Sequence, residues 1–390
     1  MMRKYGVWPN FGPEEETAVS QVLRSGRVNY WTGEQGKKFE EEFAEYANTK
    51  YAVALSNGTI ALELALRALG VGYGDEVIVT PRTFIASISA IVMVGATPVF
   101  ADVDPDSQNI RPDSIEEVLT ERSRAIIAVH LAGWPCDMER LLSIAHENDL
   151  YVVEDCAQAH GALYKGRSVG GIGHVGAWSF CQDKIMTTGG EGGMITTNDS
   201  LLWERVWSLK DHGKSRDAIY NQNHPTGFRW LHESFGTNAR MTEMQAAIGR
   251  VQLRKLSEWS EKRSRNASIL EKCFLNIPAF RVTSTPETVR HAYYKYYVFV
   301  KKNLLKDGWN RDRILEAISG KGVPCFSGSC PEVYLENAFE GTEFKPTSRL
   351  PVARELGDSS LMFLVHPTLT TDDMHTKCQI VCEVMRQASI

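Results

Sequence analysis

The stretch YVVEDC, residues 151–156, begins as an apolar, β-rich run and ends in two carboxylates and a cysteine. Helical patterns such as IALELALRAL (60–69) separate most of the similar runs around it. Apolar strands that alternate with helices predict a mostly parallel sheet covered on both faces. The sequence therefore predicts an α/β fold whose large domain has a seven-stranded, mostly parallel sheet flanked by helices. The other six runs are YAVALS (51–56), EVIVTP (76–81), TPVFADVD (97–104), AIIAVHL (125–131), GAWSFC (176–181) and GMITT (193–197).

Outside these runs the pattern becomes mainly helical, and it ends in a smaller unit. We expect a large domain with its N-terminal helices over residues 1–250. A long connecting helix and a smaller C-terminal α+β domain should follow over residues 251–390. The expected helices are 14–24, 35–47, 83–94, 114–120, 138–148, 241–276, 311–319 and 371–386, and the expected C-terminal strand is 293–300.

The composition disfavours several classes of protein. The 390 residues include 43 Lys and Arg against 48 Asp and Glu, which gives a formal net charge of −5. This mild acidity argues against a surface that attracts nucleic acid or anionic lipid. Hydrophobic residues make up 43% and charged residues 23%, values that are typical of soluble globular proteins rather than of disorder or coiled coil.

Two further features bear on location and on metals. The first residues, MMRKYGVWPNFGPEEE, contain no apolar stretch long enough for a signal peptide, so we expect a cytoplasmic protein. The uncharged stretch 83–101 is interrupted at 95–98 before a membrane-spanning length, and we interpret it as a buried helix followed by a strand. The eight cysteines include no CxxC pair, so we expect reduced thiols and no metal site.

The residues SNGT (56–59) lie between a predicted strand and a predicted helix. A helix N-terminus offers unpaired N–H groups and a positive dipole end, which suit a phosphate. Gly58 would let the backbone come close to such a group, and Thr59 adds a hydroxyl. An ordinary helix cap gives the same pattern, so both interpretations stay open.

Asp155 and Glu154 follow the apolar strand residues directly. An acid at the carboxyl end of a buried parallel strand faces the crevice in which α/β proteins bind ligands. The protonated ring nitrogen of a cofactor would compensate its charge, and so would a backbone turn at the strand end.

Lys184 lies after the strand at 176–181 and before GGEGG (189–193). A lysine in such a glycine-flanked loop is a candidate for Schiff-base formation, because a crowded or desolvated ammonium loses its proton more easily. A surface lysine is the alternative. The stretch GTNAR (236–240) could cap the following helix or contact an anion. GIGHVG (171–176) matches GxGxxG but precedes a strand, so we interpret it as a turn.

Together, a phosphate-binding helix terminus, a strand-end acid and a loop lysine in a large α/β domain fit one cofactor, pyridoxal 5'-phosphate (PLP). The acid would hold the pyridinium proton, the lysine would bind the aldehyde carbon, and the helix terminus would take the phosphate.

From about residue 9 to the C-terminus, the chain resembles the DegT/DnrJ/EryC1/StrS family of PLP-dependent nucleotide-sugar aminotransferases. These proteins have the aspartate aminotransferase-like architecture known as PLP fold type I. The resemblance is carried by a combination of motifs: SNGT (56–59), EDCAQAHG (154–161), WSF (178–180) with GGEGG (189–193), and GTNARMTEMQAAIGRVQL (236–253).

The resemblance implies roles for four residues around the cofactor ring. Lys184 would be the catalytic residue that binds PLP covalently and later moves the proton. Asp155 would pair with the pyridine nitrogen, and Gln158 would lie beside the ring hydroxyl. Phe84, in TPRTFIAS (80–87), would stack on the ring.

The resemblance also implies how the phosphate is held and how the subunits are arranged. Ser179 would bind the phosphate together with Gly58 and Thr59. Asn238 would reach the phosphate of the neighbouring subunit, so the active unit would be a homodimer with shared active sites.

The implied reaction has two halves. L-Glutamate would give its amino group to the cofactor, and the aminated cofactor would then aminate a nucleotide-linked keto-sugar. We favour C4 of dTDP-4-keto-6-deoxy-D-glucose, for the amino sugars of a surface polysaccharide such as O-antigen. A C3-aminotransferase, a UDP-sugar enzyme and a PLP-dependent sugar dehydratase are alternatives, although family dehydratases carry histidine in place of the lysine. A regulator or a non-catalytic binding protein fits the intact motifs less well.

The chain departs from the common family pattern in three places, and the last of them, in the C-terminal segment, concerns the sugar. Arg82 stands where a small or polar residue is expected, LAGWPCDM (131–138) lacks the usual Tyr or Phe before the glycine, and GVPCFSGSCPEVYLENAF (322–339) lacks a His-Tyr pair. The loop GRVNYWTG (26–33) either contacts the sugar or nucleotide or is simply a packed aromatic loop. The candidate substrate residues are Tyr30, Trp31 and Tyr334.

Overall fold

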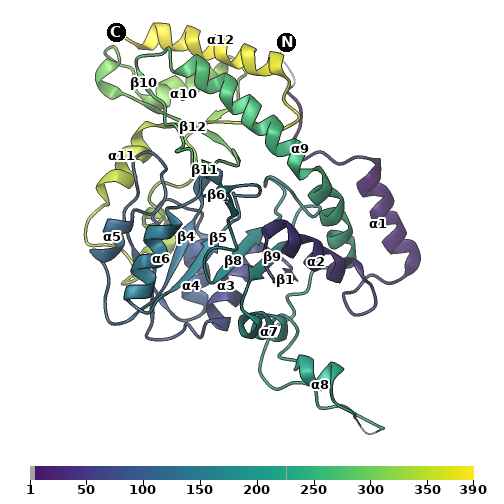
Figure 1. The fold of residues 1–390 in the computed structure, drawn as a ribbon. Coiled ribbons are helices and arrows are strands. Elements are labelled where there is room, and N and C mark those ends of the chain that lie inside the picture. Colours follow the sequence, from purple (N-terminus) through teal and green to yellow (C-terminus); the bar gives the residue numbers. More distant parts are fainter. Residues whose placement is uncertain (1–4, 225) are drawn as a thin grey trace.

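The computed structural model describes residues 5–224 and 226–390. A seven-stranded sheet in the order β1-β9-β8-β5-β4-β2-β3 forms its centre (Figure 1). The pairs from β8 through β5, β4 and β2 to β3 are parallel, whereas β9 is antiparallel to both of its neighbours. All seven predicted strands and the mostly parallel arrangement are therefore confirmed. The strands are β1 (Tyr51–Leu55), β2 (Glu76–Val79), β3 (Thr97–Phe100), β4 (Ser123–Val129), β5 (Tyr151–Asp155), β8 (Val175–Ser179) and β9 (Gly193–Thr197).

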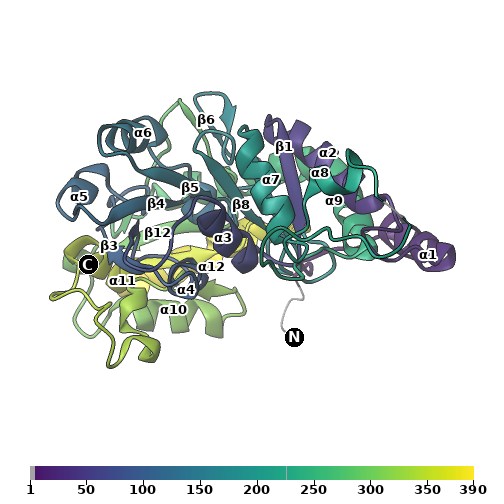
Figure 2. The same cartoon turned by 90° about the horizontal axis from the view of Figure 1, so that it is seen from below.

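Helices cover both faces of this sheet, because its strands are apolar on both sides. One face packs on α3 (Gly58–Ala68), α4 (Ala86–Met93) and α7 (Ser200–Leu209). The other face packs on two groups of helices (Figure 2). These are α5 (Pro112–Glu116) and α6 (Met138–Glu147) near β4, and α2 (Gln35–Ala47) and α9 (Glu243–Phe274) near β1 and β8.

The second packing unit contains an antiparallel sheet of four strands in the order β10-β12-β14-β13. The C-terminal part of α9 packs with this unit, while its N-terminal part packs against α1 (Pro13–Ser25) and α2. The expected division at residue 250 stays a prediction, since α9 runs through both units without a break. The elements of this unit are β10 (Phe280–Arg281), β12 (Tyr296–Val300), β13 (Cys325–Phe326), β14 (Ser360–Phe363), α10 (Arg311–Gly320), α11 (Pro351–Ser359) and α12 (Thr371–Ala388).

Some features lie outside the predicted elements. A small sheet joins β6 (Leu163–Tyr164) and β7 (Arg167–Ser168) to the distant β11 (Val289–Arg290). The short helix α8 (Arg216–Tyr220) and the described residues of the loop after it extend away from the body of the molecule (Figure 1). The stretch 83–101 forms α4 and β3, as expected. In the part of the chain that the structure describes, no helix has the length and apolar character needed to cross a membrane.

Candidate active site

The candidate site is a cavity of about 970 Å³ at the carboxyl ends of the parallel strands. Two structural features bring its residues together. Parallel strands place their carboxyl ends at one edge of the sheet, and the loops after them converge there. The cavity is lined by seven of the predicted cofactor residues, namely Gly58, Thr59, Phe84, Asp155, Gln158, Ser179 and Lys184.

One wall of the cavity is the N-terminus of α3. Asn57 caps this helix, because its Oδ1 accepts a hydrogen bond of 2.9 Å from the backbone N–H of Ile60. The cap interpretation is thus confirmed, and it does not displace the phosphate interpretation, since Gly58 and Thr59 line the cavity. A Cβ on Gly58 would lie 2.6 Å from the Cβ of Ser179 and 3.0 Å from its Oγ. Only glycine lets the helix terminus and the end of β8 approach so closely.

Asp155 ends β5 at the cavity, and its carboxylate is almost completely buried. Oδ1 accepts a hydrogen bond from the backbone N–H of Ala157 at 3.1 Å, and Oδ2 accepts one from Ser87 at 3.0 Å. Burial raises the pKa of Asp155 above its usual value, while these hydrogen bonds and nearby Lys184 oppose the rise. Ser87, whose hydroxyl also contacts Thr83, had no signal in the sequence beyond its place in a helix.

Lys184 lies in the loop between β8 and β9 and points into the cavity rather than onto open surface. The indole N–H of Trp8 donates a hydrogen bond of 2.8 Å to its backbone carbonyl. The Lys184 Nζ lies 3.6 Å from Asp183 Oδ1 and 5.3 Å from the ring centroid of Tyr294. The Tyr294 hydroxyl donates to the other oxygen of Asp183. The lysine is therefore fixed at its backbone, while its ammonium can turn within the cavity.

Gln158 and Phe84 complete the large-domain side of the cavity. Gln158 is held in place because its Oε1 accepts a hydrogen bond of 2.7 Å from the backbone N–H of Ala132. The Phe84 side chain is 69% exposed, which is unusual for so large an apolar group. A flat ring bound in the cavity would cover it.

Asn238 and the three candidate substrate residues do not line this cavity. Asn238 is exposed next to Asp211. Tyr30 is buried and donates to Glu40, and Trp31 donates to Asp211, so the packed-loop interpretation fits 26–33 better than sugar contact does.

Tyr334 is also fully buried, bonded to Glu332 and packed on Phe100. Within the segment 322–339, the residues that reach the cavity are instead Phe326, Gly328, Ser329 and Cys330. The segment therefore reaches the cavity, but the sequence pattern did not indicate which of its side chains face inward.

The unusual Arg82 lies fully buried between the two packing units. Its Nε donates to Gln108 at 2.9 Å, and its Nη2 donates to Ser360 of β14 at 3.1 Å. The guanidinium also lies 5.8 Å from the ring centroid of Tyr297, which lines the cavity. Arg82 therefore ties the loop after β2 to the second sheet.

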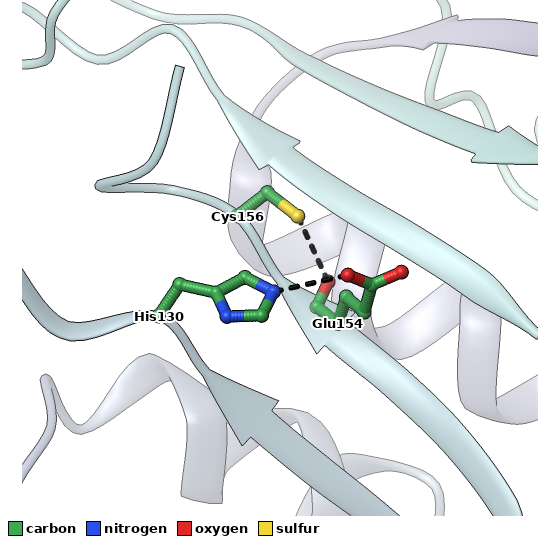
Figure 3. A group of neighbouring side chains, drawn as sticks. All are labelled: His130, Glu154 and Cys156. Carbon is green, nitrogen blue, oxygen red and sulfur yellow. Dashed lines mark hydrogen bonds and ion pairs between the residues drawn. The ribbon is translucent and has the colours of Figure 1, made fainter. Parts of the chain in front are cut away.

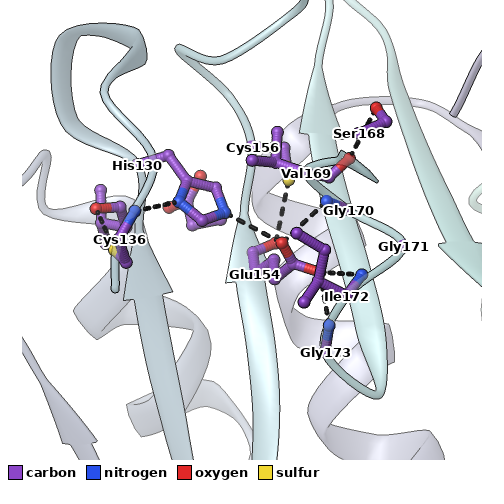
Figure 4. Close-up of polar contacts among 12 residues, drawn as sticks. His130, Cys136, Glu154, Cys156, Ser168, Val169, Gly170, Gly171, Ile172 and Gly173 are labelled. Atoms are coloured by element: carbon purple, nitrogen blue, oxygen red, sulfur yellow. Dashed lines mark hydrogen bonds and ion pairs between the residues drawn. The ribbon is translucent and has the colours of Figure 1, made fainter. Parts of the chain in front are cut away.

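Beneath the cavity, Glu154 organises a buried polar cluster with His130 and Cys156 (Figure 3). Its two oxygens accept hydrogen bonds from His130 Nε2 at 3.1 Å and from the backbone N–H groups of Gly170, Ile172 and Gly173 at 2.7–2.8 Å (Figure 4). His130 Nδ1 accepts from the backbone N–H at position 136, so Nε2 carries the proton.

These four donors occupy the lone pairs of the Glu154 carboxylate. The cluster therefore has a structural role, and its carboxylate has no lone pair left for a metal ion. Burial alone would raise the pKa of Glu154, but the hydrogen bonds from His130 and from the backbone bring it below its usual value. The glycine-rich stretch 171–176, which is a turn that leads into β8 as predicted, is the loop that this carboxylate holds.

Comparison with known proteins places this site in context. The sequence profile of the DegT/DnrJ/EryC1/StrS aminotransferase family matches residues 9–382. The chain is similar to an aminotransferase of known structure from Psychrobacter cryohalolentis, with 57% identity, coverage of 98% of this chain and 99% of the other, and a TM-score of 0.97.

Two other relatives are more distant. The dTDP-3-amino-3,4,6-trideoxy-alpha-D-glucose transaminase of Streptomyces venezuelae is 35% identical, over 91% of this chain and 88% of its own length. The PLP form of a putative sugar aminotransferase, Spr1654 from Streptococcus pneumoniae, is 26% identical over 99% of both chains, with a TM-score of 0.87.

Proposed function

The chain belongs to the DegT/DnrJ/EryC1/StrS aminotransferase family, and we propose that it moves the amino group of L-glutamate onto a nucleotide-linked keto-sugar with PLP as cofactor. The observation that carries this proposal is the cavity itself. It brings a lysine, a buried carboxylate and a glycine-tight helix terminus together from three separate loops.

The residues of the cavity fit PLP. The glycine at position 58 leaves room for a phosphate beside Ser179, where any Cβ would intrude. The Asp155 carboxylate is buried with two neutral donors and forms no ion pair with a described side chain, so a cationic ring nitrogen suits it. The Lys184 ammonium lies in the same space.

Each of these groups has a distinct task. When bound, PLP supplies an electron sink for the carbanion that forms when the substrate loses a proton. Asp155 stays ionised when it faces a cation, because the opposite charge lowers its pKa, and it keeps the ring nitrogen protonated. Ser87 and the N–H of Ala157 fix the orientation of this carboxylate.

Lys184 would act as the base. Once the amino group of the donor has taken its place, the Lys184 amine is free to carry a proton between two substrate carbons. The Trp8 hydrogen bond holds the backbone of this lysine, so its Nζ stays within reach of the reacting atoms. Phe84 would cover one face of the ring, and Gly58, Thr59 and Ser179 would hold the phosphate.

For the acceptor we propose C4 of dTDP-4-keto-6-deoxy-D-glucose, as an amino-sugar precursor, with a 3-keto sugar as the second candidate. The similar transaminase from Streptomyces venezuelae carries a 3-amino dTDP-sugar in its name, which supports the dTDP nucleotide and is the reason to keep the 3-keto sugar as the second candidate. A sugar dehydratase is disfavoured because position 184 is a lysine that can both bind the cofactor and move a proton.

We also propose a homodimer in which Asn238 contacts the cofactor phosphate of the neighbouring subunit. The loop after α8 exposes Phe228, Trp230 and Phe235 at 74%, 86% and 100%, although single chains rarely leave so much aromatic surface uncovered. One chain has a mass of 43.7 kDa, and light scattering after gel filtration should give twice this mass for the wild type.

Trp230→Ser should weaken this dimer. The matched control is Tyr73→Ser, which removes an aromatic side chain that is 98% exposed elsewhere on the surface. A wild-type protein that stays monomeric would contradict the dimer.

Absorbance spectroscopy tests the reaction. The purified protein with PLP should show visible absorption that L-glutamate removes and that one member of a panel of dTDP- and UDP-linked 3-keto and 4-keto sugars restores. Magnetic resonance of the product would then locate the new amine at C3 or C4. Lys184→Ala should lose the visible band, whereas Lys301→Ala, at an exposed lysine, should keep it. A band that L-glutamate leaves unchanged would refute the proposed donor reaction.

A further inference from the structure

Two cationic side chains line the cavity among the described residues, Lys184 and Lys295. The proposed function assigns Lys184 to the cofactor. Lys295 therefore remains as the cation that can meet an anionic group of a substrate, and neither the family motifs nor the proposed mechanism uses it.

Lys295 lies just before β12, with its side chain half-buried. Its Nζ is 4.5 Å from the ring centroid of Tyr294, and the Nζ of Lys184 is 5.3 Å from the same centroid. The phenol ring thus holds both ammonium groups in one part of the cavity through cation–π contacts.

Among the described residues, no carboxylate forms an ion pair with Lys295 alone. The acid that acts on it is Asp183, which already receives the Tyr294 hydroxyl and lies 3.6 Å from the Lys184 ammonium. Burial, together with the nearby charges of Arg263 and Lys184, lowers the pKa of Lys295 to about 8, although Asp183 opposes the shift.

Burial lowers the pKa of the neighbouring His366 to about 3. An imidazole is neutral or cationic, so it cannot offset the charge of the ammonium. Leaving an ammonium so poorly compensated costs free energy that a bound anion would recover.

We propose that Lys295 binds the α-carboxylate of the amino-acid donor and thereby selects α-amino acids as donors. The inference rests on the proposed function and deepens it. The amino group of the donor must reach the position of the Lys184 Nζ, and the α-carboxylate is attached to the same carbon as that amino group. A cation next to Lys184 therefore suits this carboxylate.

The diphosphate of a nucleotide sugar fits Lys295 less well. In a 4-keto hexose linked through C1, the diphosphate lies across the sugar ring from the carbon that reacts beside Lys184. An anion in that position would be recognised at the mouth of the cavity rather than beside the catalytic amine.

The test measures the two half-reactions separately in the PLP-loaded protein. Lys295→Met should raise the L-glutamate concentration at half-saturation about 10- to 100-fold, as expected for the loss of one charge-assisted hydrogen bond. It should leave the visible spectrum, the affinity for PLP and half-saturation by the keto-sugar within about 2-fold. Lys295→Arg, which keeps the charge, should stay much closer to the wild type, and it serves as the second variant if the methionine variant folds poorly.

The matched control is Lys301→Met, because Lys301 is exposed at the other end of β12 and should change neither half-reaction. Unchanged L-glutamate saturation in Lys295→Met overturns the inference and leaves the proposed function intact. A shift in keto-sugar saturation or in PLP affinity instead assigns Lys295 to the diphosphate or to the cofactor and also overturns it. A wild-type protein that binds PLP but does not react with L-glutamate refutes both proposals.

Discussion

Replacing Glu154 by glutamine should destabilise the protein from beneath the active site. The carboxylate accepts hydrogen bonds from His130 and from the backbone N–H groups of Gly170, Ile172 and Gly173. A glutamine side chain offers one oxygen in place of two. Whichever oxygen becomes an amide, two buried donors lose their acceptor and face an N–H group.

The magnitude follows from this count. A buried donor left without an acceptor costs about 1–3 kcal/mol, so two of them cost about 2–6 kcal/mol of unfolding free energy. Losing one partner of a buried charged contact costs about 3–5 kcal/mol, which agrees with this range. The loss should be concentrated in the loop at 170–173, which the carboxylate ties to β5.

Chemical denaturation gives the total change, and hydrogen–deuterium exchange locates it. Glu154→Gln should lower the transition midpoint and speed exchange at the amides of Gly170, Ile172 and Gly173. Glu121→Gln, at an exposed carboxylate, is the matched control and should stay within about 0.5 kcal/mol. If Glu154→Gln is equally stable and its loop exchanges as slowly as in the wild type, the carboxylate does not hold the loop.

Lowering the pH should also weaken the contribution of Glu154 to stability. The folded pKa of Glu154 lies below its usual value, so its contribution to stability is complete above the unfolded pKa and is lost as the pH falls through the folded pKa. The stability of Glu154→Gln should therefore fall less steeply on acidification than that of the wild type. An identical acid profile for the two proteins would contradict this assignment.

Two further predictions concern the cavity. Gly58→Ala should weaken PLP binding by about 10-fold or more in a spectroscopic titration, because the new Cβ would lie 2.6 Å from the Cβ of Ser179. The control is Gly320→Ala, where nothing lies within 4 Å of the new Cβ. Equal PLP affinities of the two variants would contradict a phosphate site at Gly58. The affinity for L-glutamate should fall as the pH rises through about 8, because Lys295 binds the carboxylate only when protonated. Lys295→Arg should remove this part of the pH dependence. The same pH profile in the wild type and in Lys295→Arg would refute the prediction.

Much of the fold could be predicted because its elements follow from local sequence patterns. Each strand of the large sheet is a short apolar run bounded by turn residues, and β5 with its terminal acid is typical. The strands β6, β7 and β11 could not be predicted, because each has only two residues and β11 pairs with β6 across more than 100 residues of sequence.

Some residues of the candidate site could also be predicted from local patterns, and others could not. Asp155 and Lys184 follow strands that the pattern reveals, so their convergence could be inferred from the parallel sheet. Lys295 lies inside YYKYYVFV (293–300), where the sequence indicates only a strand. Ser87 looks like any small helix residue, and its contact with Asp155 appears only when α4 packs beside β5. Tyr30 was a candidate sugar contact, but tertiary packing buries it against Glu40.

We propose above that the cavity binds PLP through Lys184. The most direct measurement is borohydride reduction of the PLP-loaded protein, which fixes the cofactor to the amine that holds it, followed by peptide mapping by mass spectrometry. We expect the cofactor on Lys184 alone, and L-glutamate added before the borohydride should protect this lysine from labelling. Labelling of Lys295, or no labelling of either lysine, would refute PLP binding through Lys184.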